Sequence, residues 1–163
     1  PPSDLEIEEA CKRLKNNKAA GIDLITGEIV KQSSTVRSEL SVLIRGFWNG
    51  EEIDEECKTA ILVPLFKNKG SRSDPKAYRG ISLLPIIERI VSLIMLNRIQ
   101  TPLECHLLPQ QYGFIGGKSC RDPVRTVFRR IQNKGGYVSM FVDFQRAFDT
   151  LRWDSVFEIL RWA

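Results

Sequence analysis

The sequence predicts an α+β fold that is rich in helix and has only a few short strands. Apolar residues recur at helical spacing in several separate segments. Two short runs of β-prone residues flank a basic loop near the middle of the chain. A third, mostly apolar run extends from Tyr137 to Phe144. A chain of 163 residues, 42% of them hydrophobic, is long enough to bury a core.

The first fifty residues predict three helices. Ser3 and Glu6 have the spacing of a capping box, and the apolar residues that follow recur with a helical period. Gly21 is expected in the turn after this first helix. Two further amphipathic helices are predicted over Gly27–Lys31 and Val36–Trp48.

Two strands are predicted next, over Thr59–Phe66 and Tyr78–Leu84, with the basic loop Lys67–Lys76 between them. Pro64 lacks an N–H group, which confines the first strand to a sheet edge or makes Pro64 part of a strand end. The longest predicted helix then begins at Pro85.

That longest helix is expected to stop near Thr101-Pro102, because proline disrupts a helix interior. Gln110–Ser119 is predicted to be a glycine-rich loop. Asp122-Pro123 then has the pattern of an N-cap followed by proline at the first helical position, which predicts a basic helix to about Gln132.

The stretch Phe141–Asp149 is the strongest candidate for chemistry. Gly135-Gly136 is expected to turn the chain into the strand Tyr137–Phe144, and a last helix is expected from Asp149 onward. A carboxylate at the end of an apolar strand, here Asp143, costs roughly several kcal/mol if it stays unpaired. Asp143 is therefore expected either to bind a metal or a cation, or to cap the next helix.

The net charge of +4 is unevenly distributed. Two basic stripes fit contacts with a polyanion along defined surfaces, although solvated faces would give the same composition. Four scattered cysteines and one histidine indicate neither a zinc site nor a disulfide framework, and favour reduced thiols in a soluble, intracellular protein without a membrane span. The stripes consist of Lys67, Lys69, Arg72, Lys76 and Arg79, and of Lys118, Arg121, Arg125, Arg129, Arg130 and Lys134.

Five stretches of the chain together have the residue types and spacing of known motifs. They are Lys18–Asp23 with Glu28–Lys31, Ala60–Gly70, Asp74–Leu84, Gln111–Phe114 with Gly117–Ser119 and Asp122, and Phe141–Asp149 with the helix after it. Together they resemble the reverse transcriptase of a non-LTR (LINE-type) retrotransposon. They follow one another in that family's order and extend over essentially the whole chain.

Four residues depart from the family pattern. Leu24 stands where the family usually has glycine, and Ile115 where it usually has arginine. Gly116 replaces a common proline, and Lys118 a common arginine. These departures bear on turn geometry and on contacts with the template backbone, and they would also fit drift in an inactive copy.

The resemblance implies the fingers and the first part of the palm of a right-hand polymerase, with residues 1–109 fingers-like and 110–163 forming the junction and the start of the palm. It also implies a two-Mg²⁺ site, in which ions about 3.5–4 Å apart stabilise the attacking and leaving oxygens. Asp143 would supply one carboxylate and Phe144 a backbone carbonyl. Asp149 is expected in a turn or a helix start, not at the metal.

The same resemblance assigns substrate contacts. Arg79 would grip the triphosphate of the incoming dNTP, assisted by Lys67 or Lys69, unless it forms a structural ion pair with an acid such as Asp74. Phe148 would be the steric gate that excludes a 2′-hydroxyl, unless it is a core residue. Nucleotide and template contacts are expected from Gln111, Gly113, Phe114, Lys118, Arg121, Arg125 and Arg129.

The family's aromatic-x-Asp-Asp motif does not occur in the sequence. The 163-residue chain is therefore expected to be inactive alone, although its family copies an RNA template onto a DNA primer, in a nuclear or cytoplasmic ribonucleoprotein. The alternative is a relic that binds RNA or DNA without catalysis. An RNA-dependent RNA polymerase is disfavoured by Phe148, because such an enzyme needs room for the 2′-hydroxyl. The oligomeric state stays open.

Overall fold

The computed structural model describes residues 1–133, 138–145 and 147–162. The chain forms two compact units, Pro1–Arg98 and Ile99–Ala163. The predicted turn at Gly135-Gly136, the first residue of the predicted strand (Tyr137) and the basic residue Lys134 lie outside the described residues. No helix in the described ranges is both long enough and apolar enough to cross a membrane.

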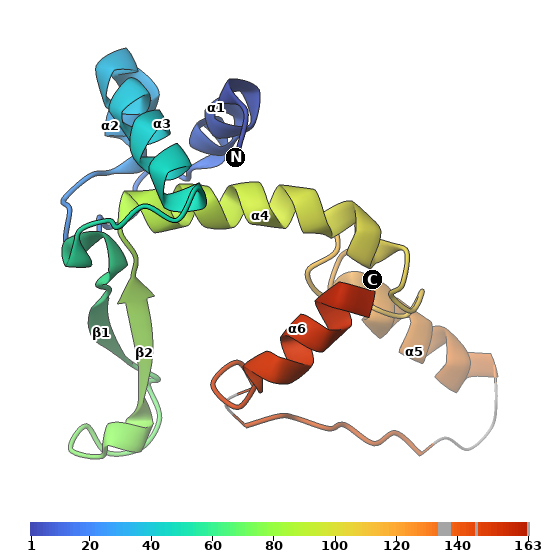
Figure 1. The fold of residues 1–163 in the computed structure, drawn as a ribbon. Helices are drawn as coiled ribbons and strands as arrows, with labels where there is room; N and C mark the ends of the chain where they lie inside the picture. The colour runs from blue at the N-terminus through green and yellow to red at the C-terminus, as the bar shows by residue number, and fades with distance from the viewer. Residues whose placement is uncertain (134–137, 146, 163) are drawn as a thin grey trace. The chain divides into compact units, whose positions relative to one another are not determined.

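The first unit is built on four helices: α1 (Asp4–Arg13), α2 (Gly27–Gln32), α3 (Ser34–Trp48) and the first part of α4 (Ile86–Glu104) (Figure 1). These four helices share one hydrophobic core, as the helical spacing of their apolar residues predicts. The three predicted N-terminal helices are confirmed. The buried cluster consists of Ile7, Ala10, Cys11, Leu14, Val30, Leu40, Ile44, Ile86, Ile87, Ile90, Val91 and Ile94.

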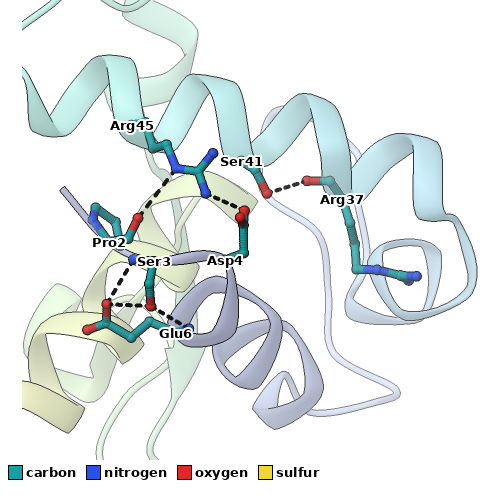
Figure 2. Close-up of polar contacts among 7 residues, drawn as sticks. All are labelled: Pro2, Ser3, Asp4, Glu6, Arg37, Ser41 and Arg45. Carbon is teal, nitrogen blue, oxygen red and sulfur yellow. Dashed lines mark hydrogen bonds and ion pairs between the residues drawn. The ribbon is translucent and has the colours of Figure 1, made fainter.

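The start of α1 is fixed by polar contacts. The predicted capping box is present, since Ser3 Oγ accepts from the Glu6 N–H at 3.3 Å and the Glu6 carboxylate accepts from the Ser3 N–H at 2.9 Å. Arg45 of α3 binds the Asp4 carboxylate and donates to the Pro2 carbonyl, which ties α3 to the first residues of the chain (Figure 2).

Glu6 is also held by α4. The guanidinium of Arg98 donates to both Glu6 oxygens, at 2.6 and 3.0 Å, and lies over the Trp48 ring at 4.8 Å from its centroid. The hydrogen bonds from Arg98, then from the Ser3 backbone, lower the pKa of Glu6 from 4.5 to about 2. This carboxylate therefore links the N-terminal cap, α3 and α4.

Both middle strands are confirmed as an antiparallel hairpin. β1 (Ile61–Phe66) follows the 3₁₀ turn η1 (Glu55–Lys58), and β2 (Tyr78–Leu83) follows the 3₁₀ turn η2 (Pro75–Ala77). Phe66 pairs with Tyr78 and Pro64 with Gly80. Each strand has only one neighbour in this sheet, so Pro64 lies on an edge strand, as its missing N–H requires.

The helix α4 differs from the prediction at its C-terminal end. It continues through Pro102 to Glu104 instead of stopping at Thr101-Pro102. Pro102 lies only two residues before the end of α4. Its missing N–H removes one backbone hydrogen bond, and only two residues of helix follow it, so the helix ends soon after the proline.

The second unit contains the last part of α4, α5 (Arg121–Asn133) and α6 (Trp153–Trp162). The predicted basic helix is confirmed, but it starts at Arg121, so Asp122 lies in its first turn and is not its N-cap. The Asp122 carboxylate still accepts from the Ser119 N–H, at 2.8 Å.

Two predictions in this unit are wrong. Residues 138–144 form no strand, and the last helix begins at Trp153 instead of Asp149. A strand needs a partner to satisfy its backbone N–H and carbonyl groups, and the described residues place none beside this segment. Most side chains of the segment and of α6 are exposed, including Phe141, Phe144, Trp153 and Trp162.

Candidate nucleotide and template site

The basic loop of the hairpin is a folded structure. The Lys67 N–H donates to the Ala77 carbonyl at 2.8 Å, and the Lys67 Nζ donates to the Lys76 carbonyl, also at 2.8 Å. The Tyr78 hydroxyl donates to the Arg72 carbonyl at 2.9 Å, and Arg72 lies over the Phe66 ring. These contacts give the loop a defined fold at the end of the hairpin.

Arg79 and Lys69 are exposed in this arrangement. Within the described ranges neither forms an ion pair, and Asp74, the alternative partner of Arg79, instead accepts from the Lys76 N–H at 2.9 Å. Lys67 is less available, because the Lys76 carbonyl engages its ammonium group. Of the three predicted triphosphate contacts, Arg79 and Lys69 have free charged groups.

The glycine-rich loop is closed by Lys118. Its Nζ donates to the carbonyls of Pro109 at 2.9 Å and Gln111 at 2.7 Å, and it lies 5.5 Å from the centroid of the Tyr112 ring. The Gln111 amide donates to the Gly113 carbonyl at 2.9 Å. Both side chains, assigned from the sequence to template and nucleotide, shape the loop in this structure.

Phe114 and Phe148 meet edge to face, with ring centroids 6.3 Å apart and planes at 88°. Phe114 has φ +64, a left-handed conformation uncommon for a residue with a side chain. The rings are 91% and 76% exposed, so Phe148 is not a core residue within the part of the chain that the structure describes. The glycine-rich loop and the stretch after Asp143 are thus brought together.

Asp143 and Phe144 lie in an extended, exposed segment. The Asp143 carboxylate has no hydrogen-bond or ion-pair partner among the described residues, and Asp143 does not cap α6, which starts ten residues later at Trp153. No group of three or more His, Cys, Asp or Glu side chains within those residues could hold a metal ion. Asp149 lies in a turn before α6.

The helix α5 is strongly two-sided. Arg121, Arg125 and Arg129 are exposed and follow one another at four-residue spacing, which places them along one face. Val124, Phe128 and Ile131 form an apolar stripe at the same period and are about half exposed. The arginine face is a free cationic surface of the kind that phosphates bind.

One cluster was not assigned from the sequence. The Asp23 carboxylate accepts from the Ile86 N–H at 2.5 Å and from the Ile25 N–H at 3.2 Å. A Cβ atom on Gly21 would lie 2.6 Å from the Leu84 carbonyl oxygen, so only glycine fits there. Leu24, at the position where the family usually has glycine, has φ +56. The signals in the sequence were that departure and the family-like stretch Lys18–Asp23, neither of which gave Asp23 a role.

Comparison with known proteins identifies the family. Residues 66–161 match the family model described as reverse transcriptase (RNA-dependent DNA polymerase). The chain belongs to the reverse transcriptase family. The matched region contains the free cations of the hairpin, the glycine-rich loop, and Asp143 with Phe148.

The relatives come from retrotransposable and other mobile elements. The chain is 34% identical to a Pol polyprotein from the type-1 retrotransposable element R1 of Bradysia coprophila, over 95% of this chain and 16% of that protein. It is 30% identical to a putative 115 kDa protein in the element R1DM of Drosophila melanogaster, over 92% of this chain and 15% of that protein. An RNA-directed DNA polymerase from the Drosophila mobile element jockey is 24% identical over 88% of this chain.

These matches confirm the recognition of a non-LTR retrotransposon reverse transcriptase. The chain spans about one sixth of the length of the curated relatives it matches, as the coverage of 15% and 16% shows. The fold is a helix-rich part of a reverse transcriptase domain with one two-stranded antiparallel sheet in the described ranges.

Proposed function

We propose that this chain is the nucleotide- and template-binding part of an RNA-directed DNA polymerase, comprising the fingers and the first part of the palm. The observation that carries the proposal is the contact between Phe114 and Phe148, five residues after Asp143. It brings the glycine-rich loop to the segment that holds the one predicted catalytic carboxylate.

Asp143 and the Phe144 carbonyl would contribute to a Mg²⁺ site. Both are hard oxygen ligands of the type that Mg²⁺ prefers, and the Asp143 carboxylate has no competing partner among the described residues. A bound divalent ion supplies charge stabilisation for in-line phosphoryl transfer. One carboxylate is only part of a two-ion site, so we expect no primer extension by the 163-residue chain itself.

Arg79 and Lys69 bind the triphosphate of the incoming dNTP. Arg79 presents a planar fork of donors that fits phosphate oxygens, and Lys69 a compact charge. Lys67 holds the loop through the Lys76 carbonyl and contributes less directly. Gln111, through its bond to the Gly113 carbonyl, fixes the loop that faces the nucleotide.

Phe148 excludes the 2′-hydroxyl of a ribonucleotide, and the edge-on ring of Phe114 restricts where the Phe148 ring lies. Edge-to-face pairs contribute about 0.5–1.5 kcal/mol beyond their buried area. The template phosphates lie along Arg121, Arg125 and Arg129, whose exposed heads have no acidic partner among the described residues.

Titration of the chain with dATP and Mg²⁺, followed by NMR chemical shifts, tests this function. We expect shifts at Arg79, Lys69 and Phe148, a weaker affinity for ATP, loss of the dATP shifts in Arg79→Ala, and loss of the Mg²⁺ effect in Asp143→Asn. Shifts that are the same for dATP and ATP would exclude Phe148 as the gate.

The free arginine face of α5 favours a second function, binding of RNA or DNA without catalysis. In that case salt-dependent RNA binding persists in Asp143→Asn and the chain shows no response to dATP. Binding of both RNA and dATP supports the polymerase assignment.

A further inference from the structure

The hairpin that carries Arg79 is attached to the helices of the first unit only at its base. Its strands extend from the start of α4 away from α1, α2 and α3 (Figure 1). No residue of β1 or β2 belongs to the buried cluster, and the apolar side chains Leu62 and Leu65 are more than half exposed. Packing therefore does little to fix the direction in which the hairpin points.

The end of β2 is the point at which that direction is set. β2 ends at Leu83, and only Leu84 and Pro85 separate it from α4. Pro85 and Ile86 are buried. A change of backbone angle over these residues would swing Arg79 relative to the helical core, because Arg79 lies at the far end of the same strand.

The segment from Gly21 to Ile25 contacts the connection between β2 and α4. Gly21 packs against the Leu84–Pro85 backbone, where a Cβ would come within 2.6–2.8 Å of three backbone atoms. Asp23 accepts from the first N–H of α4, that of Ile86, at 2.5 Å. Its second oxygen accepts from the Ile25 N–H at 3.2 Å, which orients the carboxylate.

We propose that Asp23 is a positioning residue for nucleotide binding: it fixes the base of the hairpin, and through it the position of Arg79. The proposal rests on the proposed function of Arg79. A carboxylate suits this task because it accepts two N–H groups at once and is favoured at the N-terminus of α4. Gly21 is required beside it because the two backbones touch.

Asp23→Asn is the informative variant. An amide keeps one acceptor oxygen and faces the other N–H with a donor, so one of the two bonds is lost without a change of size. If the hairpin then samples other directions, the apparent affinity for a triphosphate falls in proportion to the competent fraction, here about three- to fivefold.

The experiment titrates the whole chain with inorganic triphosphate and with dATP, read by NMR shifts. A matched control is Val30→Ala, which removes methyl groups from a fully buried side chain in α2 and lowers stability without removing either hydrogen bond to Asp23. We expect Asp23→Asn to weaken triphosphate binding and Val30→Ala to leave it unchanged at the same temperature below both unfolding transitions.

The double variant Asp23→Asn with Arg79→Ala separates the two proposals. If Asp23 acts through the hairpin, Asp23→Asn weakens triphosphate binding less in the Arg79→Ala background than in the original chain, because only Lys69 is then left on the hairpin to bind the triphosphate. An equal loss in both backgrounds, or a loss in Val30→Ala as large as in Asp23→Asn, would overturn the role of Asp23 and leave that of Arg79 intact.

If Arg79→Ala itself has no effect, the proposed function of Arg79 fails instead. Amide exchange at Ile86 then still reports on the base of the hairpin. Faster exchange at Ile86 in Asp23→Asn would show that Asp23 holds the base of the hairpin but positions a residue other than Arg79. This outcome also refutes the positioning role for Arg79.

Discussion

Leu24→Gly is expected to stabilise the first unit although it removes a large apolar side chain. Leu24 has φ +56, and a left-handed conformation costs an L-residue about 1–2 kcal/mol. Glycine avoids that cost but loses about 0.5–1 kcal/mol through the greater freedom of the unfolded chain. The side chain is 77% exposed, so little buried area is lost.

The net expectation is a gain in the free energy of unfolding within a range of about 0–1.5 kcal/mol. Urea unfolding followed by circular dichroism measures it, with Leu24→Ala as the matched control. Alanine keeps the Cβ atom and therefore the strain, so it should be no more stable than the original chain.

The reasoning is refuted if Leu24→Gly unfolds at a lower urea concentration than Leu24→Ala. In that case a Cβ atom at the left-handed position of residue 24 does not carry the strain that its φ of +56 implies. A change in the urea dependence of the free energy, with no change in midpoint, would instead indicate an effect on the unfolded chain.

Three further predictions follow from particular contacts. Glu6 has a pKa of about 2 in the folded chain, against an ordinary value of 4.5. Its contribution to stability is therefore present above pH 4.5 and is lost as the pH falls towards 2. Glu6→Gln should flatten the pH dependence of stability over that range, measured by thermal unfolding. Lys118→Met should speed amide exchange across residues 110–119 without changing the salt dependence of RNA binding. Arg125→Ala should lower the slope of the logarithm of the RNA-binding constant against the logarithm of the salt concentration by about one. The opposite pattern would make Lys118 the template contact. Phe114→Leu should shift the Phe148 ring resonances and reduce the preference for dATP over ATP about two- to tenfold, given about 0.5–1.5 kcal/mol for the ring pair; unchanged Phe148 resonances would show that the rings do not meet in solution.

The sequence by itself determined the helices, the hairpin and the family. Capping residues, helical spacing and the proline at an edge strand are local signals, and they placed α1, α2, α3, β1 and β2 within a few residues. The stretches around Asp143 and Gln111 identified a reverse transcriptase because residue types at fixed spacing survive in a motif.

Local signals failed where a distant partner decides the structure. The run 138–144 has the composition of a strand but forms none, because a ladder depends on a second strand. The last helix starts at Trp153, and the sequence pattern after Asp149 does not predict that start. The continuation of α4 past Pro102 depends on how close proline lies to the helix end.

Only the tertiary structure decided what several motif residues do. The sequence predicted Lys118 to be a template contact, but in the structure its ammonium group donates to two backbone carbonyls of its own loop. Asp23 reads as part of a motif, and the fold brings it to Ile86, 63 residues further along the chain. Such roles follow from which backbone groups lie within hydrogen-bond distance, and that distance is set by packing of the whole unit.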